Sequence, residues 1–116
     1  MAKALFLWKS TCSTCRNARA FLRDELGAEL DERNYAKTPF TLAELGRIFK
    51  GADPRDFINP KSESFKAMGL KGRTLTREQA LKLIVEQPNL LKRPLTIVGG
   101  EFIAGFDRER MRALLA

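Results

Sequence analysis

The chain has 116 residues, of which 44% are hydrophobic and 30% are charged, and its net charge is +7. This length and composition predict one globular domain, residues 1–116, with enough chain to bury a core. The apolar runs are much shorter than the roughly 20 residues that a membrane-spanning helix needs. We therefore expect a cytoplasmic protein without a membrane partner.

The cysteine and histidine content limits the kinds of catalysis and metal binding that the chain can support. The chain has two cysteines, Cys12 and Cys15, and no histidine. A secreted disulfide scaffold would carry more cysteines, spread along the chain. The missing histidine excludes Cys–His catalysis and removes the commonest transition-metal ligand. We expect no metal and no bound cofactor.

Hydrophobic spacing and capping residues predict the elements in chain order. The predicted strands cover residues 4–8, 29–35, 95–98 and 101–104. The predicted helices cover residues 13–26, 41–50, 62–68 and 76–87, with a last one after Asp107. Capping boxes open the helices at Thr41 and Thr76, and Gly99-Gly100 is typical of a two-residue β-hairpin turn.

The order of these elements indicates the fold class. A β-α-β segment comes first, then a helical stretch, then β-β-α. This order predicts an α/β protein with a thioredoxin-like (glutaredoxin-like) core, formed by residues 1–36 and 88–116, and a helical insertion over residues 37–87.

The cysteine pair lies where the first strand gives way to the first helix. Free amide N–H groups and the helix dipole at such a position stabilise a thiolate, which is the reactive form of cysteine. Cys12 would lie at the exposed helix cap and attack a disulfide, and Cys15, one turn further, would resolve the mixed disulfide. Half of a zinc site and two ordinary buried cysteines are the alternatives, but zinc normally needs four ligands.

Residues next to the cysteine pair favour ionisation of the thiols and leave Cys12 accessible to a substrate. Lys9 and Arg16 add positive charge near the thiols. Ser13 and Thr14 are small and polar, so they leave the first thiol open to a substrate or partner.

A second candidate segment is Arg93-Pro94, just before the third predicted strand. In a thioredoxin-like sheet this loop would face the cysteine turn, and an X-Pro bond there can be cis. Arg93 could hold an oxyanion or a thiolate with its fork of donors. A plain helix-to-strand turn carrying a solvated charge explains the same residues.

The basic charge is densest in residues 36–75, which hold eight basic and four acidic side chains. One interpretation of this basic excess is an ordinary solvated surface. The other is a surface that binds oxyanions, glutathione or an acidic face of a protein. Without a dense basic run or a set of stacking aromatics, we expect no direct binding of nucleic acid.

Several segments together resemble the arsenate-reductase-like (ArsC/Spx) branch of the thioredoxin fold, along essentially the whole chain. These segments cover residues 10–19, 41–45, 62–70, 88–95 and 105–106. The resemblance implies three kinds of function: arsenate reduction supported by glutathione and glutaredoxin, redox-sensing regulation through the C-terminal domain of the RNA polymerase α subunit, and general thiol reduction.

The resemblance also assigns residues. Cys12 corresponds to the arsenate reductase nucleophile and Arg93 to one of three family arginines. The arginine of the insert falls at about Asn59, with Lys61 close by, and the third falls near Gly105. Cys15 matches the pattern of the Spx-type regulators.

The leading hypothesis is therefore a thiol-disulfide oxidoreductase that uses Cys12, Cys15 and Arg93. Ser13, Thr14, Arg16, Lys61 and Pro94 would form its substrate or partner loops. Glutathione or a thioredoxin or glutaredoxin system would supply electrons. A regulator that binds the RNA polymerase α subunit and a genuine arsenate reductase are the alternatives.

Overall fold

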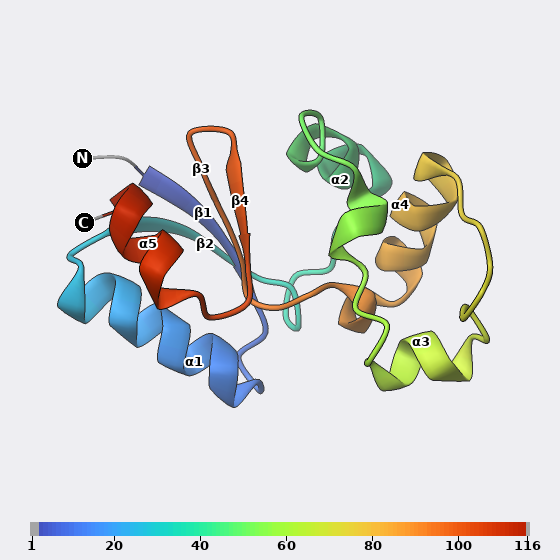
Figure 1. Cartoon of the computed structure of the whole chain (residues 1–116), viewed down its shortest axis with the longest axis horizontal. Coiled ribbons are helices and arrows are strands. Elements are labelled where there is room, and N and C mark those ends of the chain that lie inside the picture. The colour runs from blue at the N-terminus through green and yellow to red at the C-terminus, as the bar shows by residue number, and fades with distance from the viewer. Residues whose placement is uncertain (1–2, 116) are drawn as a thin grey trace. The chain divides into compact units, whose positions relative to one another are not determined.

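Figure 1 shows the computed structural model of the chain, which describes residues 3–115. The described residues form two compact units. The first runs to Thr38 and resumes at Arg93, and the second is Pro39–Lys92. Among the described residues, no helix is both long and apolar enough to cross a membrane.

The first unit is built on a four-stranded sheet in the order β2-β1-β3-β4. Its strands are β1 (Lys3–Trp8), β2 (Glu29–Asn34), β3 (Leu95–Val98) and β4 (Glu101–Ala104). β1 runs parallel to β2 and antiparallel to β3, and β3 and β4 form an antiparallel hairpin. The predicted strand order along the chain and the hairpin at Gly99-Gly100 are confirmed.

Two helices share one face of this sheet (Figure 1). They are α1 (Ser13–Ala20), which continues as the π-helical turn η1 (Phe21–Glu25), and α5 (Arg108–Leu115). One apolar cluster joins both helices to alternate residues of the strands: Ala4, Phe6, Ala18, Phe21, Leu22, Val98, Ile103, Met111 and Leu115. This packing fixes the start of α1 at the end of β1.

The second unit is helical. It contains α2 (Leu42–Ile48), η2 (Pro54–Phe57), α3 (Glu63–Ala67), α4 (Arg77–Glu86) and η3 (Pro88–Leu90). Both predicted capping boxes form, since Thr41 and Thr76 each accept a hydrogen bond from the N–H three residues on and receive the reciprocal side chain. Its buried side chains include Leu45, Phe49, Ile58, Leu70, Ala80, Ile84 and Leu90.

The structure departs from the predicted elements in two ways. The helix expected over residues 13–26 is α-helical only to Ala20, because the last turn widens and the N–H of Leu26 bonds to the carbonyl of Phe21. The short 3₁₀ turns η2 and η3 were not predicted. Each begins at a proline, which suits the first turn of a helix because its fixed φ and missing N–H cost nothing there.

Asn34, at the end of β2, holds the loop that leads to the cysteines. Its Nδ2 donates to the Ser10 Oγ at 3.0 Å, and its Oδ1 accepts from the N–H groups of Ser10 at 3.3 Å and Ala36 at 3.2 Å. The side chain thereby joins the loop after β1 to the turn after β2.

Replacing Asn34 tests this link. Asn34→Ala removes three hydrogen bonds of a half-buried amide, so we expect the free energy of unfolding to fall by about 1–3 kcal/mol. The matched control is Asn17→Ala, since the Asn17 side chain is exposed on α1 and alanine favours a helix. Chemical denaturation of both variants measures the difference, and an equal stability of the two would contradict the link.

Candidate thiol site

Cys12 is the N-cap residue of α1. Its φ of −94° and ψ of 121° are extended, and its carbonyl accepts the first helical hydrogen bond, from the N–H of Arg16 at 3.1 Å. The N–H of Cys12 donates to the carbonyl of Lys9 at 2.9 Å and closes the turn after β1. The first turn of α1 holds no acidic side chain, so nothing there opposes negative charge on the sulfur.

The two thiols differ in exposure. Both cysteines are free; Cys12 is partly exposed and Cys15 is fully buried. This is the placement that the sequence predicts, with one thiol at the cap and the other a turn inside the helix. The two sulfurs are close enough for the thiol of Cys15 to interact with that of Cys12.

The pKa of Cys12 lies below its ordinary value of 9.0. Partial burial alone would raise it, since a thiolate loses solvation. The backbone N–H and thiol of Cys15, the positive charge of Arg93 and the backbone N–H of Thr14 act in the opposite direction and together outweigh burial. The thiolate form of Cys12 is therefore favoured by its surroundings.

The pKa of Cys15 moves the other way and rises from 9.0 to about 12. Burial is the largest cause, and the neighbouring Cys12 raises the pKa further by its hydrogen bond and its charge. The backbone of Lys9 and the charge of Arg93 only partly offset these effects. At neutral pH the pair therefore holds one activated sulfur and one neutral thiol.

Arg93 and Tyr35 complete the polar surroundings of the pair. Burial acts to lower the pKa of Arg93, but Tyr35 and Cys12 raise it on balance, so the guanidinium is charged. Tyr35 is 4% exposed, and burial raises the pKa of its hydroxyl to about 12 despite the opposing charge and hydrogen bond of Arg93. Tyr35 is thus a neutral phenol beside the guanidinium that faces Cys12.

Tyr35 was not identified from the sequence. It directly follows β2, where its N–H donates to the carbonyl of Trp8 at 3.1 Å and extends the pairing of β2 with β1. The strand was predicted to include residue 35, but alternation alone did not indicate which chemical group the side chain would meet. The available signal was that the chain's only tyrosine follows a strand end next to the cysteine turn.

The Arg93-Pro94 peptide bond is cis. Pro94 is buried, and its carbonyl accepts a hydrogen bond from the N–H of Gly105 at 2.8 Å, which extends the β3–β4 hairpin. The expected loop between the helical segment and the third strand is therefore part of the sheet unit, and Arg93 from this loop reaches the cysteine pair.

The remaining predicted site residues are placed as follows. Ser13 and Thr14 are exposed on the first turn of α1. Arg16 is exposed, and its Nη1 donates to the carbonyl of Ser10 at 2.9 Å, so it stabilises the loop before the pair. Lys61 lies in the helical unit, between η2 and α3, and is exposed.

This arrangement suits thiol chemistry. Within residues 3–115, no three cysteine or acidic side chains gather as ligands for an ion. One sulfur is partly exposed and favoured as a thiolate, and a second, neutral thiol lies beside it. A pair with this asymmetry can form a mixed disulfide at the outer sulfur and resolve it with the inner one.

Known proteins with similar sequences place this chain in a family. Residues 7–114 match the model of the ArsC family. The uncharacterized protein YusI of Bacillus subtilis is 30% identical over 109 residues, covering 90% of this chain and 92% of its own length. The global transcriptional regulator Spx of Streptococcus agalactiae is 33% identical over 113 residues, covering 96% of this chain and 81% of its own length.

The fold has solved counterparts. The arsenate reductase from Vibrio cholerae superimposes with a TM-score of 0.80 over 98% of both chains, at 21% identity. At this identity the likeness shows the fold, and it confirms the predicted thioredoxin-like core. Together with the family model across nearly the whole chain, these findings show that the chain belongs to the ArsC family.

Proposed function

We propose that the protein is a thiol-disulfide oxidoreductase in which Cys12 is the nucleophile and Cys15 the resolving thiol. The observation that carries the proposal is the position of Cys12, partly exposed at the start of α1 and beside Arg93, with Cys15 buried one turn inside. Membership of the ArsC family supports the same chemistry.

The reaction has two sulfur exchanges. The Cys12 thiolate attacks one sulfur of a substrate disulfide, and the other sulfur leaves as a thiolate and takes up a proton. Cys15 then loses its proton and attacks the Cys12 sulfur, which releases the second substrate thiol. The substrate gains two electrons and the protein keeps a Cys12–Cys15 disulfide.

The cycle needs an external thiol to reduce this disulfide. Glutathione or a thioredoxin or glutaredoxin system is the proposed donor, as the family resemblance implies. Arg93 contributes to the first exchange, because its positive charge favours the Cys12 thiolate that attacks the substrate.

Substitution of each cysteine separates the two roles. Cys12→Ser should lose the reduction of a small aromatic disulfide that releases a coloured thiol, because the attacking sulfur is gone. Cys15→Ser should keep the first attack and accumulate a mixed disulfide on Cys12, which intact-mass spectrometry detects. The control is Asn17→Ala, an exposed position one turn further along α1, which should react like the parent.

Two results would contradict the assignment. One is a Cys12→Ser variant that reduces the disulfide as fast as the parent. The other is a mixed disulfide that accumulates on Cys15 in the Cys12→Ser variant as readily as on Cys12 in the Cys15→Ser variant.

A redox-sensing regulator is the second candidate. The observation that favours it is the 33% identity to a global transcriptional regulator over 96% of this chain, together with the cysteine pair. In this role the Cys12–Cys15 disulfide would be a switch, and the proposed partner is the α subunit of RNA polymerase.

A pull-down tests the regulator directly. The regulator hypothesis expects purified α subunit to retain the protein to different extents under oxidising and reducing conditions, with the difference lost in Cys15→Ser. No retention in either redox state would remove this candidate and leave the oxidoreductase proposal intact.

The site supports arsenate reduction less well than it supports thiol-disulfide exchange. Arg93 is the matched family arginine near Cys12. Arg108, the basic residue that follows Gly105, stacks on the ring of Phe106 at 4.3 Å from its centroid and also lies 5.9 Å from that of Phe21. Its guanidinium is thus engaged with aromatic side chains of η1 and of the segment before α5.

A further inference from the structure

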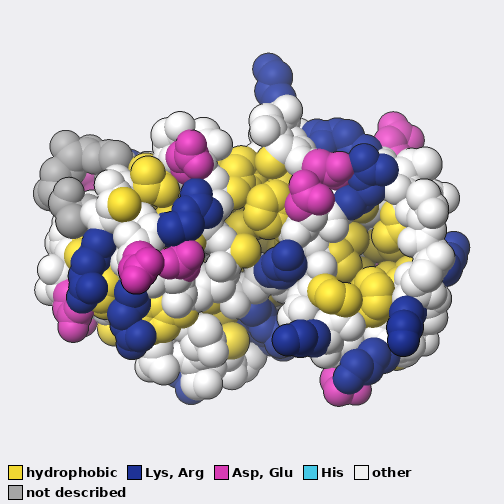
Figure 2. Space-filling view, viewed as in Figure 1, with side chains coloured by type: hydrophobic (Ala, Val, Ile, Leu, Met, Phe, Trp, Pro, Cys, Tyr) yellow, Lys and Arg dark blue, Asp and Glu magenta, His cyan; other side chains and the backbone are white. Residues whose placement is uncertain are grey.

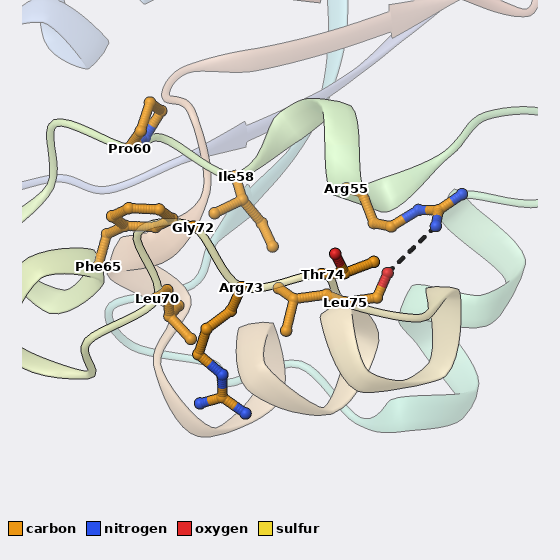
Figure 3. Close-up of a pocket in the computed structure, with 9 residues that line it drawn as sticks. All are labelled: Arg55, Ile58, Pro60, Phe65, Leu70, Gly72, Arg73, Thr74 and Leu75. Carbon is orange, nitrogen blue, oxygen red and sulfur yellow. Dashed lines mark hydrogen bonds between the residues drawn. The ribbon is translucent and has the colours of Figure 1, made fainter.

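The helical unit carries an apolar hollow that the thiol chemistry does not use. Its volume is about 380 Å³. Figure 3 shows the residues that line it. Five apolar residues and two arginines contribute to its wall, together with glycine and threonine: Arg55, Ile58, Pro60, Phe65, Leu70, Gly72, Arg73, Thr74 and Leu75. All of them belong to residues 39–92 and none is a cysteine.

Specific contacts fix the segments that form the wall of the hollow. Ser62 caps α3 through a hydrogen bond from the N–H of Phe65 at 3.1 Å, and Gly69, with a φ of 63°, turns the chain after this helix. The Arg55 Nη1 donates to the carbonyl of Leu75 at 3.1 Å, which ties the far wall to η2 (Figure 3). These contacts fix the chain segments that carry the lining side chains.

A second hollow of about 310 Å³ adjoins the first and shares Pro60 and Phe65 with it. Its other lining residues are Lys66, Gly69 and Lys71. Phe65 is half-buried and lines both hollows, so an apolar side chain entering either one would meet its ring. We call the two together the Phe65 surface.

The charged side chains that line the Phe65 surface are all basic. Arg55 is neutralised by Asp53, to which it donates hydrogen bonds of 2.7–3.0 Å. Lys66, Lys71 and Arg73 form no ion pair with the described part of the chain. No acidic residue lines either hollow.

We infer that the Phe65 surface is a docking site for an acidic peptide segment of a partner protein, with one apolar side chain seated against Phe65 and flanking carboxylates on Lys66, Lys71 and Arg73. Protein interfaces commonly combine an apolar side chain buried in a pocket with charged residues around its rim. The buried side chain provides most of the affinity, and the rim charges provide selectivity. Figure 2 shows hydrophobic surface bordered mainly by basic side chains over the region of α3.

The charge pattern selects this occupant. The three unpaired cations would repel a basic segment, and a purely anionic ligand would leave the apolar wall unused. A segment that joins an apolar side chain to carboxylates satisfies both features. The inference does not depend on the proposed function, because the surface lies outside the sheet unit that carries the thiol site.

A nuclear magnetic resonance titration tests the inference on the full-length ¹⁵N-labelled protein. The added peptide has a central leucine flanked on both sides by glutamates, with blocked ends. We expect saturable shifts of amide signals within residues 60–75, weakened by added salt because the rim charges are exposed. Replacing the central leucine by serine should weaken binding, and replacing the glutamates by lysines should abolish it.

Charge reversal locates the contact. Lys71→Glu combined with Arg73→Glu should raise the dissociation constant by at least about tenfold, since two attractions become repulsions. The matched control is Arg47→Glu combined with Lys50→Glu, which changes the net charge equally on exposed residues that do not line either hollow. This control should bind like the parent.

Three results would overturn the inference. The first is shifts that centre outside residues 60–75. The second is an equal loss of affinity in both charge-reversed variants, which would indicate only a general attraction of net charge. The third is stronger and more localised shifts with a single-stranded oligonucleotide than with the peptide, which would make the surface a nucleic-acid site.

Discussion

The site depends on one electrostatic balance, at the sulfur of Cys12. Burial opposes a negative charge on this atom, while the amide end of α1, the thiol of Cys15 and the guanidinium of Arg93 favour it. The favourable contributions win, so the pKa falls. At Cys15, one turn further into the helix, burial dominates and the pKa rises to about 12. Two identical side chains three residues apart thus have different chemistry.

The same balance couples the thiols to stability. The folded chain lowers the pKa of Cys12, so ionisation of this thiol stabilises the fold above its unfolded pKa, and this contribution is lost as the pH falls through the folded value. Cys15 acts oppositely: its contribution is present below its unfolded pKa near 9 and is lost as the pH rises toward about 12. Reduced protein at neutral pH therefore keeps Cys15 neutral without cost.

Much of the fold could be predicted because its signals are local. Gly99 and Gly100 adopt φ values of 55° and 82°, which other residues rarely adopt, so a Gly-Gly pair between two strands indicates the hairpin. The capping boxes at Thr41 and Thr76 are likewise contained in four residues each. The position of Cys12 at a helix start follows from a strand pattern and a helix pattern that meet at this residue.

What the sequence could not predict depends on contacts between distant segments. Tyr35 and Arg93 are 58 positions apart in the chain and meet only because β2 and the loop before β3 lie beside the start of α1. Asn34 reaches Ser10 across a separation of 24 residues. The widening of the helix at Phe21 has no local signature that we can name, and the hollows around Phe65 arise from the tertiary path of residues 58–75.

The most direct test of the electrostatic balance at Cys12 measures the pKa of each thiol separately. The pH dependence of the alkylation rate gives the pKa of Cys12 in the reduced Cys15→Ser variant, where serine keeps a hydroxyl donor at position 15. The same measurement on the Cys12→Ser variant gives the pKa of Cys15. We predict a pKa below 9.0 for Cys12, which rises in a further Arg93→Ala substitution, and a pKa well above 9.0 for Cys15. Two equal values near 9.0, or a Cys12 value unaffected by the loss of Arg93, would contradict it.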